Sequence, residues 1–183
     1  MLLARKKSWQ MQKGRQATIV DTNVPVTANR RDGGSYESAS ACAAELMAIR
    51  ERGYLLVDDQ DLIVAEYKTY LNYRGQPGAG DAFFRWFFSN RWKADLCRTV
   101  HIQPITHEWC QFEEFPHDAA LKDFDPSDQK FVATAISSKA DAHILEATDH
   151  KWLKWHECLK KYGVVVRFIC IEQLQATMKR KAR

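Results

Sequence analysis

No long hydrophobic run occurs in this sequence of 183 residues. Its apolar runs reach about five residues, whereas a membrane-spanning helix needs roughly 18. The first residues, Met-Leu-Leu-Ala, precede a group of basic residues, which is the reverse of the order in a secretory signal. No internal repeat or low-complexity segment is evident. We therefore expect a soluble protein with no membrane association and no secretory signal.

The sequence also lacks the cysteine and histidine patterns that hold zinc. Its five cysteines are odd in number, widely scattered and without a C-x-x-C pair, which predicts a reducing, cytoplasmic location. His156-Glu157 lacks the second histidine of a zincin helix, and the other histidines show no paired ligand spacing. A zinc knuckle, a redox motif and a zincin are thereby excluded.

Charge of one sign is not in strong excess. The 27 Lys and Arg against 23 Asp and Glu give a net charge of +4, too mild to identify a nucleic-acid-binding protein. A chain of this length can bury one full core, so we expect a single domain over 17–174. We predict a flexible basic arm over 1–16 and a basic tail over 175–183, where solvated charge is the commoner outcome.

Strand and helix patterns alternate along the chain. Short apolar runs predict strands at 18–20, 54–57, 100–105, 143–145 and 164–169. Helical spacing predicts helices over 37–52, 62–71, 83–92, 125–139 and 149–161, and a basic helix from 171 onward. Gly53 suits the end of the first helix, Asp58-Asp59 the cap of the second, and Asp125-Pro126 the start of the fourth. The alternation predicts a single-domain, three-layer α/β/α fold with a mostly parallel central sheet.

Four acidic residues fall near the predicted strand ends or on helices that connect strands. Asp21 ends the first strand, Glu66 lies on the helix after the second, Asp128 on the first turn of the helix from 125, and Asp149 after the strand at 143–145. Ligands of open α/β sheets bind outside the carboxyl ends of the strands, so these acids are expected to converge there. Repulsion among them calls for a cation, and carboxylate oxygens suit Mg²⁺ or Mn²⁺.

At these residues the sequence resembles the PIN-domain ribonucleases. Val20-Asp21-Thr22-Asn23-Val24 is similar to the family's opening strand, and Glu66-Tyr67 to its helix-borne acid. The segments 125–131 and 144–152 resemble its third and fourth acidic motifs. The resemblance implies a PIN-like fold and a metal-dependent endoribonuclease with Asp21, Glu66, Asp128 and Asp149 as catalytic metal ligands, Asn23 and Thr148 as supporting residues, and RNA as substrate. Toxin-type relatives imply an antitoxin or other regulatory partner and a homodimer.

The resemblance leaves alternatives open. Singly, each acid has an ordinary structural explanation as a turn or capping residue, and Glu45 competes with Glu66 for the helix-borne position. The aromatic and basic segment 75–98 is interpreted as an insertion whose aromatics pack in a core or against a partner. Arg85, Arg91, Lys93 and His150 are candidate substrate contacts. Two other functions remain, a structure-specific DNA nuclease and a noncatalytic PIN-like interaction module.

Overall fold

The computed structural model describes residues 14–74, 78–172 and 174. The arm predicted over 1–16 falls outside this range up to residue 13, and the tail predicted over 175–183 falls outside it entirely. The strands are β1 (Gln16–Val20), β2 (Gly53–Asp58), β3 (Cys97–Val100), β4 (Ala142–Glu146) and β5 (Val165–Phe168). The α-helices are α2 (Asn23–Ala28), α3 (Tyr36–Arg52), α4 (Leu62–Tyr70), α5 (Ala79–Asn90), α6 (Gln129–Ser137) and α7 (Trp152–Lys160).

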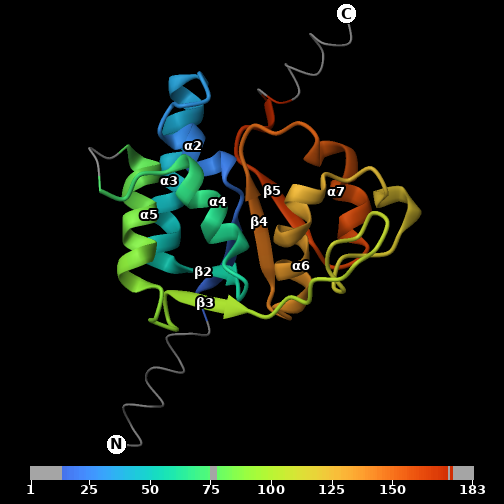
Figure 1. Cartoon of the computed structure of the whole chain (residues 1–183). Coiled ribbons are helices and arrows are strands. Elements are labelled where there is room, and N and C mark those ends of the chain that lie inside the picture. The colour runs from blue at the N-terminus through green and yellow to red at the C-terminus, as the bar shows by residue number, and fades with distance from the viewer. Residues whose placement is uncertain (1–13, 75–77, 173, 175–183) are drawn as a thin grey trace, which may run out of the picture.

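The five strands form one parallel sheet in the order β3-β2-β1-β4-β5. In Figure 1, α3 and α5 lie to the left of β4 and β5, while α6 and α7 lie to the right. The predicted three-layer α/β/α fold with a parallel sheet is therefore confirmed. Because all strands are parallel, their carboxyl ends share one edge of the sheet, and the first strand in sequence lies at its centre.

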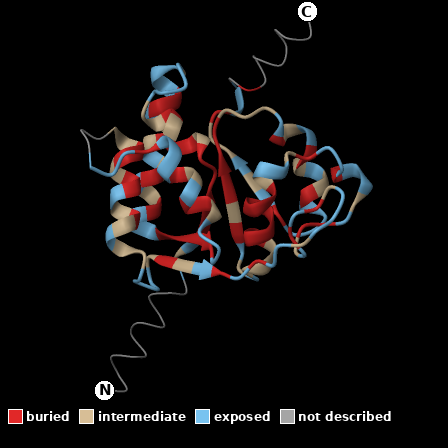
Figure 2. Ribbon diagram, viewed as in Figure 1, coloured by how far each residue is buried: buried red, intermediate tan, exposed pale blue. Residues whose placement is uncertain are grey.

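The central strands are apolar because helices cover both of their faces. All six residues of β2 and four of the five in β1 are buried, in agreement with the continuous apolar runs of parallel sheets. The edge strand β5 contains no buried residue. Figure 2 shows the buried residues concentrated on the inner strands and the inward helix surfaces. The sheet is thus held by a core centred on β1, β2 and β4.

The segment interpreted as an insertion belongs to this core. Phe83, Phe84 and Phe87 of α5 are at most 1% exposed, and α5 packs against α2 and α3. The end of the same segment, residues 97 and 98, forms the first half of the edge strand β3, which pairs with β2. The strand predicted at 100–105 was misplaced: only Val100 of that range is in β3, and Pro104 forms an isolated antiparallel bridge with Phe112 instead. The expectation that the aromatics pack in a core is confirmed for these three.

Side-chain caps fix the starts of the helices that carry the candidate acids. The Asp58 carboxylate accepts hydrogen bonds from the backbone N–H groups of Leu62 and Ile63 at 2.8 Å, and α4 begins at Leu62, in agreement with the predicted cap before that residue. Asp125 accepts from the Ser127 N–H at 3.0 Å and starts the 3-10 turn η2 (Pro126–Asp128), which leads into α6. Both caps match the predicted capping roles of Asp58 and Asp125.

Candidate active site

A pocket of about 310 Å³ opens at the carboxyl edge of the sheet. Four separate segments contribute to it: the end of β1 with α2, the helix α4, the turn η2, and the loop between β4 and α7. Its lining residues are Asp21, Thr22, Asn23, Val26, Glu66, Tyr70, Asp125, Ser127, Asp128, Asp149 and Lys151. All four predicted acids and the predicted supporting residue Asn23 are therefore brought together around one cavity.

Asp21 is the deepest of the predicted acids, with only 5% of the residue exposed. Its backbone N–H continues the sheet by donating to the Leu145 carbonyl at 3.0 Å, and its Oδ1 accepts from the Asn23 N–H at 3.0 Å. The Tyr67 hydroxyl of α4 donates a hydrogen bond to the carbonyl of Val20, the residue before Asp21. The carboxylate is thus fixed by the end of a central strand and by the first turn of α2.

Glu146 is a fifth acid in this region that sequence reasoning missed. It ends β4 and is fully buried, with Oε2 accepting from Asn23 Nδ2 and Oε1 from the Asp149 N–H, both at 2.7 Å. Asn23 also accepts from the Ala147 N–H at 2.9 Å, so its amide joins the ends of β1 and β4. The available signal was an acid at the end of an apolar strand, the same signal that identified Asp21.

Two acids at the rim have lysine partners. Lys130 Nζ lies 2.5 Å from Glu66 Oε2, and Lys151 Nζ lies 2.9 Å from Asp125 Oδ2. Asp128 lies between Asp125 and Lys130 in sequence. It makes no ion pair with Lys or Arg within 4 Å in the described part of the chain. The pairing leaves Asp21, Asp128 and Asp149 as the pocket acids whose charge no lysine or arginine neutralises directly.

Asp149 lies where the loop from β4 turns into α7. Its Oδ1 accepts from the Lys151 N–H at 2.9 Å, an ordinary turn contact two residues along the chain, and lies 3.9 Å from His150 Nδ1. His150 is 38% exposed at its side chain, so it stands beside an acid of the pocket as predicted for a substrate contact, although it does not line the cavity. Thr148 is half-buried and does not line the cavity either.

Burial and mutual repulsion raise the pKa values of the inner acids. Burial is the largest cause at Asp21, whose pKa lies well above its usual value, and the charges of Glu146 and Asp128 add to it. Burial likewise raises the pKa of Asp128 to about 7, with the Asp125 charge next, and that of Glu146 to about 8. Hydrogen bonds from Asn23 and Asp149 oppose the rise at Glu146. The pocket therefore favours protons or another cation.

The donor chemistry fits a hard divalent cation, although the ligands are not preassembled. Carboxylate oxygens are the ligands that Mg²⁺ and Mn²⁺ prefer, and the Thr22 hydroxyl oxygen in the pocket wall is buried without a hydrogen-bond partner. Within residues 14–74, 78–172 and 174, however, no group of three or more acidic, histidine or cysteine side chains is arranged to hold a metal ion. The carboxylates face a common cavity and would need to move toward a bound ion.

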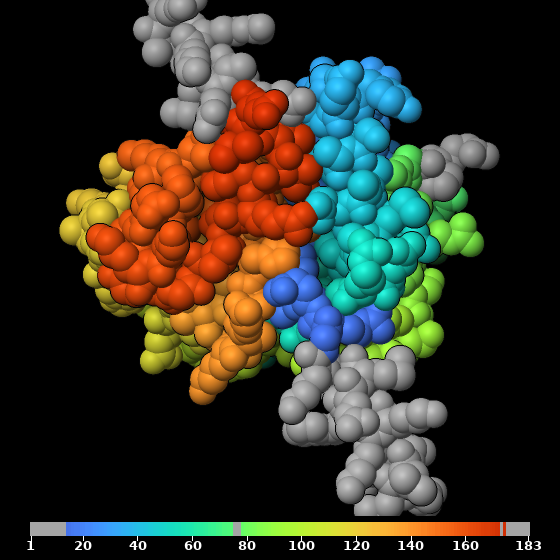
Figure 3. Space-filling model, turned by 180° about the vertical axis from the view of Figure 1, so that it is seen from behind, coloured from blue at the N-terminus to red at the C-terminus, as the bar shows by residue number. Residues whose placement is uncertain are grey.

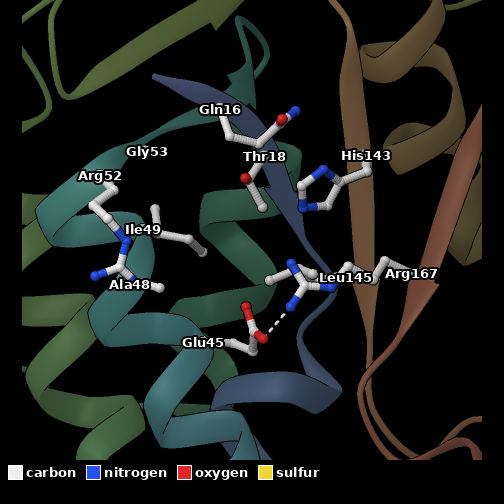
Figure 4. A pocket seen from close by; sticks show the side chains of 10 residues that line it. All are labelled: Gln16, Thr18, Glu45, Ala48, Ile49, Arg52, Gly53, His143, Leu145 and Arg167. Carbon is white, nitrogen blue, oxygen red and sulfur yellow. Dashed lines mark hydrogen bonds and ion pairs between the residues drawn. The ribbon is translucent and has the colours of Figure 1, made fainter. Parts of the chain in front are cut away.

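Glu45, the rival of Glu66, lies in a different pocket. Figure 3 shows the first residues of β1 (blue) between the end of α3 (teal) and the strands β4 and β5 (orange to red). In this region a pocket of about 250 Å³ is lined by residues of α3, β1, β4 and β5. Figure 4 shows Glu45 pairing there with Arg167, with His143 directed into the same cavity. Glu45 is therefore salt-bridged away from the acidic pocket, and Glu66 is the helix-borne acid that lines the cavity with Asp21.

Three of the four predicted substrate contacts lie on or just after α5 and do not line the acidic pocket. Arg91 pairs with Asp61 at 3.1 Å and lies 5.8 Å from the ring centroids of Phe87 and Phe88. Arg85 and Lys93 are exposed. The pocket instead presents Tyr70, whose residue is 52% exposed one helical turn after Glu66, and Lys151. A helical spacing of four from Glu66 was the signal for Tyr70.

Comparisons with family models, with curated proteins and with solved structures find no match to this chain. The resemblance to PIN domains therefore depends on the residues quoted above and stays a prediction. None of the helices in the described part of the chain is long and apolar enough to cross a membrane.

Proposed function

We propose that this protein is a metal-dependent endoribonuclease that hydrolyses phosphodiester bonds. One observation supports the proposal above all: acids from four segments far apart in sequence surround one cavity at the carboxyl edge of a parallel sheet. Ligands of open α/β sheets bind at that edge. A structural role explains each acid singly, but capping and turn formation do not require four acids to face the same cavity.

In this proposal Asp21, Asp128 and Asp149 hold the metal through their carboxylates. Mg²⁺ or Mn²⁺, when bound, supplies a water of lowered pKa and neutralises charge that develops on the phosphate oxygens. Asn23 holds the ends of β1 and β4 in register through its contacts with Glu146 and Ala147, and thereby sets the spacing between Asp21 and Asp149. No side-chain nucleophile is needed.

The rim of the cavity suits a single-stranded nucleic acid. Tyr70 offers an exposed ring beside Glu66, and its carbonyl is held by Arg31, which pairs with the buried Asp81 at 2.8 Å. Bases of any sequence stack on aromatic rings, and Lys151 can approach a phosphate. RNA is the substrate that the PIN resemblance favours. An antitoxin-like partner, a homodimer and a cytoplasmic location belong to the same proposal and depend on the resemblance alone.

The test is cleavage of a labelled single-stranded RNA by the purified full chain with Mg²⁺ or Mn²⁺. We expect Asp21→Asn and Asp149→Asn to abolish cleavage while the circular dichroism spectrum stays unchanged. Asp95→Asn, at an exposed position away from the cavity, is the matched control and should leave the rate unaltered.

Retained activity in either folded variant would overturn the assignment of the acids. Cleavage of a flapped DNA in preference to RNA would favour the DNA nuclease. A folded protein that cleaves neither substrate and gives no calorimetric signal with Mn²⁺ would favour the noncatalytic interaction module, which agrees with the absence of a preassembled ligand group among the described residues.

A further inference from the structure

Lys130 places a buried positive charge in the wall of the acidic pocket. Its side chain is 9% exposed, its Nζ lies 2.5 Å from Glu66 Oε2, and the same ammonium donates to the Ser127 carbonyl. The Nζ also lies 4.4 Å from the centroid of the Phe131 ring. A lysine so deeply buried requires partners for its charge, and Glu66 is the only carboxylate within 4 Å of it among the described residues.

The position of Lys130 in the chain fixes it beside the candidate metal ligands. It follows Asp128 by two residues in the first turn of α6, and α6 packs against β1, β2 and β4 and against α4. Glu66 approaches it from α4 with 27% of its side chain exposed. The ion pair therefore bridges the two helices at the side of the cavity, while no described lysine or arginine pairs with Asp21, Asp128 or Asp149 within 4 Å.

We propose that Lys130 is a positioning residue that acts as an internal cation: it keeps Glu66 out of the ligand set and limits the centre to one divalent ion. The inference depends on the proposed function and specifies the number of metal ions that the centre binds per chain. A second divalent ion that used Glu66 would have to displace the ammonium or lie next to it, and like charges repel strongly in a partly dehydrated site. Removing the ammonium should free Glu66 as a ligand.

Isothermal titration of the metal-free full chain with Mn²⁺ tests this assignment. We expect one ion per chain in the wild type and in Lys130→Arg, which keeps the charge. Glu66→Gln should also bind one ion, but more weakly, because the Lys130 ammonium is then unpaired and repels it. Lys130→Met, which keeps the apolar stem, should bind a second ion, and the double variant Lys130→Met/Glu66→Gln should return to one.

The titration results separate a failure of the Lys130 assignment from a failure of the proposed function. Two ions in the wild type, or a tenfold or larger loss of affinity in the double variant, in which the pair stays neutral, would overturn the role of Lys130 while leaving the nuclease proposal intact. One ion in a folded Lys130→Met would overturn it too. If Lys130→Met does not fold because Glu66 is left unpaired, the wild-type stoichiometry and the affinity of the double variant decide. No Mn²⁺ binding in any folded variant would instead refute the proposed function, on which this inference depends.

Discussion

Replacing Asp128 by asparagine should stabilise the metal-free protein at alkaline pH. Burial and neighbouring carboxylates raise the pKa of Asp128 from 3.8 to about 7. Between these values the native state binds more protons than the unfolded chain, so the free energy of unfolding falls as pH rises through this window. Asparagine has nearly the shape of the neutral acid and carries no charge to repel its neighbours.

The pKa rise sets the size of the effect. The pKa of Asp128 rises from 3.8 to about 7, and each pKa unit corresponds to about 1.36 kcal/mol. The ionised carboxylate therefore lowers the free energy of unfolding by at most about 4 kcal/mol. Asp21 and Glu146 titrate in the same pocket and share the repulsion, so we expect about 1 to 2 kcal/mol from Asp128 alone. For a protein of this size each kcal/mol moves Tm by about 2 to 4 °C, which gives a gain of about 2 to 8 °C.

The assay is thermal unfolding in EDTA at about pH 5 and about pH 8.5, repeated with saturating Mn²⁺. In EDTA the advantage of the variant over wild type should be larger at the higher pH, because about pH 5 lies only part-way between the two pKa values. With Mn²⁺ at 100 times its Kd, the wild type should gain about 2.7 kcal/mol and the order should reverse. Asp125→Asn is the matched control, because Lys151 and Ser127 hold the pKa of Asp125 below its usual value and no stabilisation is expected. A variant less stable than wild type in EDTA at the higher pH would refute the reasoning.

Two further predictions concern the rim and the packing of α5. Tyr70→Ala should weaken the binding of single-stranded RNA, measured by fluorescence anisotropy in EDTA, by about 1 to 3 kcal/mol, the value of one stacked base. The control Trp92→Ala removes a more exposed ring away from the cavity and should have no effect; equal losses would contradict the role of Tyr70. Gly80→Ala would place a Cβ 2.0 Å from a backbone oxygen of α2 and should cost about 1 to 3 kcal/mol in urea unfolding, whereas Gly14→Ala meets nothing within 4 Å; equal stabilities would show that α5 shifts freely.

The fold was predictable where one residue pattern satisfied both local propensity and burial. The run Thr18-Ile19-Val20 and the helix closed by Gly53 are placed within a residue or two of their predicted bounds. The edge strand β3 was not predicted at its true position. Its Arg98 is only partly buried and its Thr99 is exposed, and these two polar residues interrupt the apolar run. Ile102 and Ile105 carried the apolar signal instead, although they lie in an irregular segment. An edge strand is stabilised by its pairing with a neighbouring strand, and the local residue pattern does not reveal that pairing.

The sequence predicted that Asp21, Glu66, Asp128 and Asp149 meet, but it predicted neither the nearby Glu146 nor the ion pairs of these acids. Strand ends brought Asp21 and Asp149 together in the prediction because a parallel sheet aligns its carboxyl ends. The Lys130 partner of Glu66 could not be foreseen, since it depends on the packing of α6 against α4. The basic residues on and just after α5 do not line the acidic pocket, so their contact with substrate stays a prediction; their place beside aromatic residues in the sequence gave no information on which edge of the sheet they occupy.

The neighbouring positions of β1 and β4 also set when the cavity can exist during synthesis. The contact between Asn23 and Glu146 spans 123 residues, and the sheet inserts β4 beside the first strand only after β2 and β3 have been made. A nascent chain that stops before β4 has Asp21, Glu66 and Asp128 but lacks the strand that positions Asp149. Any activity of this centre is therefore delayed until the last third of the chain is available to fold, and fragments ending before β4 should be inert.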